Sequence, residues 1–213
     1  MARQPETRLS DLIEAAIKVF TAKGYRRTQM SDVARAAGVS QGTLYNYVES
    51  KEALFYLILD RSFREDALLP ARNQLPIRTP AMDAIVSRFA EQMAAEFRLP
   101  VLQRALSERR VVDARTELEA VVREYYEAMA RTRRALDLIE RSTVDLPELA
   151  EQLYLKIRRG RIDKLARYIE SRIALGEFRP LPDPPTAARL LLETVAWFAR
   201  HRHNTADSAM ISD

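Results

Sequence analysis

The residues with the clearest chemical potential lie in one short stretch, from Gly38 to Tyr47, which reads GVSQGTLYNY. It combines hydroxyl, amide and phenol side chains and contains no carboxylate. Such groups hydrogen-bond to base edges and phosphate oxygens, and the lack of acids avoids repulsion from a polyanion. The stretch therefore predicts a surface that contacts nucleic acid.

Apolar spacing on both sides of this stretch predicts the helices that position it. One helix is expected over about 8–23, ended by Gly24, and a short one follows Thr28 as N-cap and ends at Gly38. Ser40 caps a third helix over about 41–48, and a fourth runs from residue 51 towards 67. Two short helices joined by a tight turn, after a longer helix, are the layout of a helix-turn-helix.

The third of these helices is expected to turn a small, polar face outwards. Leu44 and Val48 are spaced i,i+4 and are taken as inward-facing. Steps of about 100 degrees per residue then give the outward set Gly42, Thr43, Tyr45 and Asn46. Gly42 lets the backbone approach a surface closely, while the polar side chains and the phenol of Tyr47 suit bases and phosphates.

Two further contacts are expected at helix starts. Lys51 adds its charge to the free N–H groups at the start of the fourth helix, which form an anion site. Thr28 would contact phosphate as well as cap the second helix. Two alternatives stay open: Ser40 and Thr28 could be caps alone and the tyrosines ordinary surface residues, or the helix-turn-helix could belong to a protein-interaction or assembly module that binds no DNA.

The run from Leu12 to Leu59 resembles the DNA-binding domain of the TetR (tetracycline-repressor) family of transcriptional regulators. The motifs that carry the resemblance are AAIKVFTAKGY, AAGVSQGTLYNY and SKEAL. It implies a domain that binds a partly palindromic operator as a dimer, and a second domain whose small-molecule ligand releases the DNA. The family's usual DNA contacts fall on Thr28, Ser40, Gln41, Gly42, Thr43, Tyr45, Tyr47 and Lys51.

The sequence departs from the family pattern at two positions. Gln41 stands where many members carry a basic residue, so it is expected to read a base rather than to pair with phosphate. Val48 replaces a commoner aromatic residue and leaves a smaller wedge behind the third helix.

The remainder of the chain is expected to be helical as well, so the fold class is all-α. Prolines at 70, 76 and 80 interrupt the pattern, and helices are expected over about 81–97, 101–110, 115–142, 148–175 and 186–202. We predict a helix-turn-helix domain over 1–50, a connecting helix over 51–67 and a ligand-binding and dimerisation domain over 68–213.

The second domain offers two sets of candidate residues. Aromatic and methionine side chains on the middle helices predict a ligand pocket lined by Phe89, Met93, Phe97, Leu102, Tyr125 and Met129. Apolar stripes on the late helices predict a homodimer interface with Leu153, Ile157, Leu165, Ile169, Leu191, Val195 and Phe198. Both sets could instead be ordinary core. Arg104 and Arg133 are candidates to meet an acidic ligand.

Composition excludes several classes of site. The chain has no cysteine, and its N-terminus lacks an apolar signal core, which favours a cytoplasmic protein. Residues 1–51 hold eight basic and five acidic side chains, so they carry most of the net charge of +4. His201 and His203 lie two apart and would point to different sides of a helix, so we expect no metal site. The chain has no glycine-rich phosphate loop and no motif for an activated nucleophile, so we expect no cofactor and no catalytic site.

Overall fold

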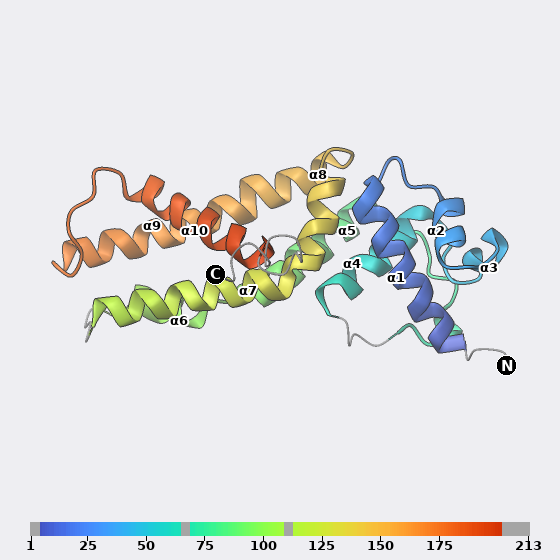
Figure 1. The fold of residues 1–213 in the computed structure, drawn as a ribbon, viewed down its shortest axis with the longest axis horizontal. Coiled ribbons are helices and arrows are strands. Elements are labelled where there is room, and N and C mark those ends of the chain that lie inside the picture. Colours follow the sequence, from blue (N-terminus) through green and yellow to red (C-terminus); the bar gives the residue numbers. More distant parts are fainter. Residues whose placement is uncertain (1–4, 65–68, 109–112, 202–213) are drawn as a thin grey trace, which may run out of the picture. The chain divides into compact units, whose positions relative to one another are not determined.

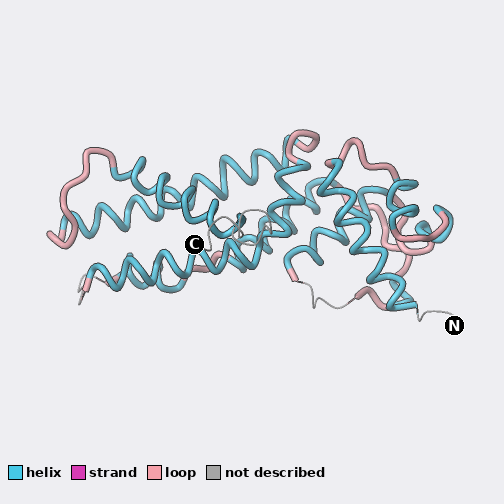
Figure 2. The backbone as a smooth tube through the Cα atoms, in the orientation of Figure 1, coloured by secondary structure: helices cyan, strands magenta, loops and turns pink. Residues whose placement is uncertain are grey.

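The computed structural model describes residues 5–64, 69–108 and 113–201, and within these ranges the chain is helical without a strand (Figures 1 and 2). Val48 and Ile77 form an isolated parallel bridge. The helices are α1 Pro5–Lys23, α2 Met30–Ala36, α3 Gln41–Tyr45, α4 Lys51–Phe63, α5 Met82–Glu96, α6 Pro100–Ser107, α7 Ala114–Ser142, α8 Pro147–Ala150, α9 Arg159–Ala174 and α10 Pro184–His201, with a 3-10 turn η1 at Arg72–Gln74 and a π-helical segment η2 at Glu151–Arg158. The all-α fold class is confirmed.

Two predicted helices differ from the structure. The single helix expected over 148–175 is divided into α8, the π-helical η2 and α9. The helix expected over 41–48 ends at Tyr45, because the chain then turns to pair with the segment at Ile77. The Ile77 N–H donates to the Tyr47 carbonyl at 2.9 Å, and the Glu49 N–H donates to the Ile77 carbonyl at 3.0 Å.

The chain forms two compact units that are not contiguous in sequence. Unit 1 comprises residues 1–92 and 134–152, and unit 2 comprises 93–133 and 153–213. The division falls inside α5, α7 and η2. It groups residues by packing, so the three sequence segments proposed above as domains stay a prediction.

The core of unit 1 gathers around α1 and α4. α1 packs against both α2 and α4, and α2 packs against α3. Phe20 and Phe55 are fully buried and their rings lie 5.5 Å apart, with Tyr25 5.1 Å from Phe55. This aromatic cluster joins α1, the loop that follows it and α4, and α1 in turn packs against α2.

In unit 2, α9 packs against α10 and α6 (Figure 1). Arg172 of α9 is buried and pairs with Glu117 of α7, through Nε at 2.6 Å and Nη2 at 2.9 Å. Its remaining donors reach the carbonyls of Ala105 and Glu108 and the hydroxyl of Ser171. Every N–H direction of this buried guanidinium is therefore used, and the pair links α7 and α9.

Candidate DNA-binding surface

The turn between α2 and α3 depends on Gly38. Its φ of 66 degrees is in the left-handed region, which glycine occupies without steric cost. The Val39 N–H reaches back to the Ala34 carbonyl at 3.0 Å and so ends α2. The prediction that Gly38 stops this helix is confirmed.

The start of α3 is fixed by Ser40. Its Oγ accepts the Thr43 N–H at 3.1 Å and lies 2.8 Å from the Thr43 hydroxyl. Leu44 and Val48 are both fully buried, as the helical wheel predicted. Cap and core together hold α3 in one orientation on unit 1.

The outer face of α3 is exposed and polar. Gln41, Gly42, Tyr45 and Asn46 are exposed, while Thr43 and Tyr47 are half-buried. Gly42 needs no special backbone conformation, and a Cβ placed there would meet only Ser40 Oγ at 3.9 Å. Among the described residues, no contact or backbone strain requires glycine at this position.

Nearby carboxylates are held away from this face or neutralised. Asp32 lies 2.8 Å from Lys23 Nζ, and the hydrogen bond from Lys23 keeps the pKa of Asp32 below its ordinary value. Glu49 Oε2 accepts the Thr79 N–H at 3.0 Å. Arg35 extends into solvent with 79% of its side chain exposed. The surroundings of α3 therefore favour an anion.

The structure corrects the roles expected for Thr28. The residue that caps α2 is Gln29, whose N–H donates to Asp32 Oδ2 at 3.1 Å. Thr28 is 1% exposed, and its hydroxyl donates to the Gly24 carbonyl at 2.7 Å. Because the O–H is already bonded and the residue is buried, the Thr28 side chain is not placed to contact phosphate.

Lys51 also differs from expectation. Its Nζ donates to the carbonyls of Tyr25, Arg26 and Thr28 at 3.0, 3.4 and 3.3 Å and lies 4.5 Å from the centre of the Tyr25 ring. An ammonium group has three N–H donors, so these carbonyls occupy all of them. Lys51 ties the start of α4 to the loop between α1 and α2, and its side chain has no donor left for phosphate.

Tyr25 and Asp145 complete the support of that loop. The Tyr25 hydroxyl donates to Glu52 at 2.6 Å, which lowers the pKa of Glu52. From the other side, Asp145 accepts the Arg26 N–H at 2.7 Å. Sequence reasoning missed Asp145 because it is 119 residues away in the chain and no local signal marks it.

Comparison with known proteins shows which sequences this chain is similar to. The profile described as "Bacterial regulatory proteins, tetR family" matches residues 12–57, which span α1 to α4. The repressor KstR2 of Rhodococcus jostii is 26% identical over 193 residues, covering 90% of this chain and 78% of the relative. YhgD of Bacillus subtilis, an uncharacterized HTH-type transcriptional regulator, is 43% identical over 54 residues, which are 25% of this chain and 28% of YhgD.

Residues 12–57 are similar to the DNA-binding domain of the TetR family. The chain is a DNA-binding transcriptional regulator, as are the relatives that it matches. Solved structures show the same fold: KstR2 of Mycobacterium tuberculosis aligns with a TM-score of 0.54 at 17% identity, covering 93% of this chain and 84% of that one. PfmR of Thermus thermophilus aligns with a TM-score of 0.51 at 19% identity, covering 93% and 86%.

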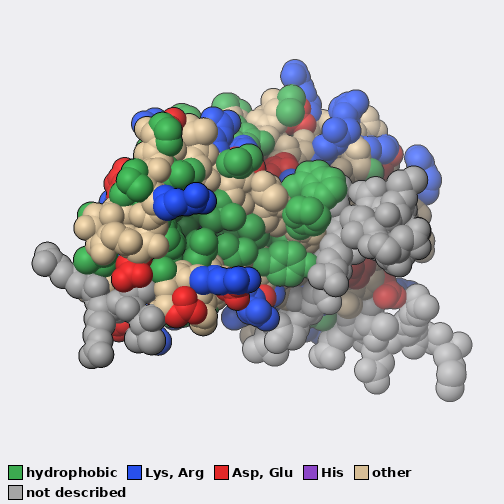
Figure 3. All heavy atoms as spheres, turned by 60° about the vertical axis from the view of Figure 1, so that its left-hand side comes forward, with side chains coloured by type: hydrophobic (Ala, Val, Ile, Leu, Met, Phe, Trp, Pro, Cys, Tyr) green, Lys and Arg blue, Asp and Glu red, His purple; other side chains and the backbone are tan. Residues whose placement is uncertain are grey.

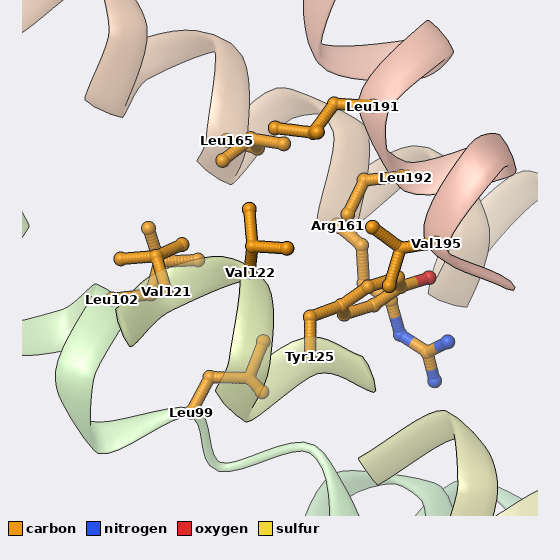
Figure 4. A pocket seen from close by; sticks show the side chains of 10 residues that line it. All are labelled: Leu99, Leu102, Val121, Val122, Tyr125, Arg161, Leu165, Leu191, Leu192 and Val195. Carbon is orange, nitrogen blue, oxygen red and sulfur yellow. The ribbon is translucent and has the colours of Figure 1, made fainter. Parts of the chain in front are cut away.

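In unit 2 of this regulator, some of the residues predicted for a ligand pocket line one cavity. Leu102 and Tyr125 do so (Figure 4), and Phe97 and Met129 surround the guanidinium of Arg161 beside it. Phe89 belongs to unit 1 and packs on Phe63, with ring centres 6.2 Å apart. The complete lining is Leu99, Leu102, Val121, Val122, Tyr125, Arg161, Leu165, Leu191, Leu192 and Val195, so Met93, Arg104 and Arg133 do not contribute.

Several residues predicted for the dimer interface are core instead. Leu153, Leu165, Ile169 and Val195 are buried within the single chain, because the inward stripe of each helix packs against its neighbour. Ile157 and Leu191 are partly exposed, and Phe198 is 46% exposed. The exposed large apolar residues of η2 and α10 are Tyr154, Leu155, Leu190, Trp197 and Phe198.

No helix within the described ranges is long and apolar enough to cross a membrane. The described residues also contain no cluster of three or more His, Asp or Glu side chains placed to hold a metal. His203 lies outside the described residues, as does the side chain of His201.

Proposed function

We propose that this regulator is a homodimeric repressor that binds a palindromic operator through α3 and leaves it when unit 2 takes up a small molecule. The observation that carries the DNA-reading part is the exposed, acid-free face of α3 with an unexplained glycine at its centre. Repression is supported by the relative that aligns over most of the chain, which is named a repressor.

Different side chains on the α3 face contact different parts of the DNA. Gln41 and Asn46 are exposed and present amides, which pair with adenine edges in the major groove. Tyr45 and Tyr47 present phenols to phosphates, while Ser40 and Thr43 hold the helix start. Gly42 brings the α3 backbone against the groove. Thr28 and Lys51 act through the loop and helix start that they stabilise.

A second copy of the chain is the partner that fits the α10 surface. Leu190 is 68% exposed, and Trp197 and Phe198 lie further along the same helix. Figure 3 shows hydrophobic side chains gathered on one face and bordered by Lys and Arg. Apolar surface of this kind is costly to leave in water. A palindromic operator, whose half-sites lie about 34–36 Å or one turn of DNA apart, likewise requires two copies of α3.

Salt dependence tests the DNA-binding function. Binding through phosphates releases counterions, so the affinity for a duplex should fall steeply as salt rises. Gln41→Glu, which places a carboxylate on the α3 face, should abolish binding at low salt. The matched variant Gln103→Glu, exposed on α6 in unit 2, should bind like wild type. Duplex binding that ignores salt, or that Gln41→Glu leaves intact, would favour an assembly module instead.

A further inference from the structure

A small, almost wholly apolar cavity lies inside unit 2 between α6, α7, α9 and α10 (Figure 4). Its volume is about 20 Å³, which is room for a single water molecule. Eight of its ten lining residues are leucine or valine, and the two exceptions are Tyr125 and Arg161. A charged residue in such a lining requires an explanation.

Arg161 sits on α9 one turn before Leu165, and its side chain runs alongside Tyr125 (Figure 4). Arg161 as a whole keeps some solvent exposure, whereas its Nη2 is buried and has no hydrogen-bond partner. Nη1 makes a soft contact with Met129 Sδ at 4.0 Å, the Tyr125 side chain interacts with the guanidinium, and the guanidinium carbon lies 3.4 Å from the centre of the Phe97 ring. Among the described residues, no carboxylate pairs with Arg161.

Arg172, on the same helix, is a buried arginine whose guanidinium has protein partners, and it serves as a comparison for Arg161. It binds Glu117 through two nitrogens and the Ala105 carbonyl through a third contact. Arg161 has none of these partners. Burial therefore lowers the pKa of Arg161, because the charged form has lost water and gained no anion.

The contacts that Arg161 does make are too weak to offset this loss. A cation–π contact stabilises a charge far less than the loss of hydration destabilises a buried charge without a counter-ion. The Tyr125 hydroxyl is the polar group beside the guanidinium, and it is neutral. The missing partner is an anion at the Tyr125 end of the cavity.

We propose that Arg161 and the Tyr125 hydroxyl bind the acidic group of an apolar organic anion, whose hydrocarbon part lies among the leucine and valine side chains of unit 2. This proposal rests on the ligand-released function and gives the chemical class of its ligand. A guanidinium offers an acid two parallel N–H donors, which explains an arginine at this position.

The size of the cavity adds a consequence for regulation. About 20 Å³ cannot hold an organic molecule, so the four surrounding helices must separate when the ligand enters. A ligand shifts a conformational equilibrium only by its different affinity for the two states. An anion that pairs with Arg161 only in the opened state supplies this difference.

A matched pair of fluorescent probes tests the proposal on the full-length chain. Anilinonaphthalene sulfonate is an apolar anion, and N-phenylnaphthylamine has the same rings without the acid. Wild type should bind the sulfonate at one saturable site at least tenfold more tightly than the neutral probe. Arg161→Met should lose that preference and keep the neutral probe, while Arg167→Met, exposed on the same helix, should behave as wild type.

The stability of the unliganded variants gives an independent readout. Removing an unpaired buried charge should leave the thermal midpoint of Arg161→Met equal to or above that of wild type. If this variant does not fold, Arg161→Lys keeps the charge and should keep the preference for the anion in weakened form. A sulfonate that binds no better than the neutral probe, or equally well to Arg161→Met, overturns the proposal.

DNA binding separates this proposal from the proposed function. Arg161→Met lies in unit 2, far in sequence from α3, and should bind duplex DNA like wild type. Loss of the anion preference with intact DNA binding supports both proposals. A wild-type chain that prefers the anion but binds no duplex refutes the repressor function and leaves the anion site standing.

Discussion

Position 42 shows how a single residue can serve a partner rather than the fold. Gly42 is exposed, takes an ordinary helical conformation and leaves open space where a methyl group would lie. Glycine is less favourable than alanine inside a helix by about 0.5–1 kcal/mol. Its presence therefore costs stability and has to be explained by what approaches from outside.

We predict that Gly42→Ala changes stability and DNA affinity in opposite directions. The free energy of unfolding should rise by up to about 1 kcal/mol, because alanine is the better helix former. The affinity for operator DNA should fall at least tenfold, because the added methyl group separates α3 from the groove. Chemical denaturation and fluorescence anisotropy measure the two effects, and unchanged affinity would contradict a close approach at this residue.

Residue patterns in the sequence correctly predicted the turn before α3 and the buried side of α3. They did not predict the contacts that hold the neighbouring loop in place. Gly38, Ser40, Leu44 and Val48 lie as their spacing indicates, since turns, caps and helix faces are local properties. The carbonyl partners of Lys51 were not predicted, because they come from a loop about 25 residues earlier in the chain. A contact of that kind leaves no local pattern.

At the level of elements, α7 and α9 of unit 2 are joined by one buried ion pair. Arg172 is 1% exposed, and both of its bonds to Glu117 are short enough to be strong. The hydrogen bond from Arg172 lowers the pKa of Glu117. A carboxylate with a lowered folded pKa adds stability that is present above its unfolded pKa and lost as the pH falls through the folded value.

We therefore expect an acid-sensitive link between these helices. The free energy of unfolding of wild type should be level above about pH 5 and fall below about pH 4.3, the ordinary value for glutamate. Glu117→Gln should lower the free energy of unfolding by about 2 kcal/mol at neutral pH and make it depend less on pH in the acidic range. Denaturant titrations at several pH values measure both. Glu119→Gln, in a solvent-exposed pair with Arg115, is the control and should do neither.

The helical stripes of α9 and α10 were predicted correctly, but the partner of each stripe was not. Leu165, Leu191 and Val195 were expected at a dimer interface, and they line the cavity of unit 2. A stripe records that a face is buried and carries no information on what buries it. The same stripe contains the signal that was missed, since Arg161 interrupts it one turn before Leu165.

For the whole molecule, the exposed apolar residues of α10 predict an assembly of two chains. Leu190→Asp places a charge on that surface and should shift the protein to monomers and weaken operator binding by at least tenfold. Leu181→Asp alters another exposed leucine, in the loop before α10, and should leave the dimer intact. Sedimentation equilibrium measures the mass, and a Leu190→Asp protein that sediments as wild type would contradict the α10 interface.

Selection of binding sites from random duplex DNA tests the central claim most directly. Wild type should recover a palindrome whose half-sites are centred about one helical turn apart, or a multiple of it. Asn46→Ala should relax the preference at one base pair of each half-site, at a cost of about 1–3 kcal/mol. Failure to enrich any sequence, or an identical palindrome from Asn46→Ala and Gln41→Ala, would contradict the reading of DNA by α3.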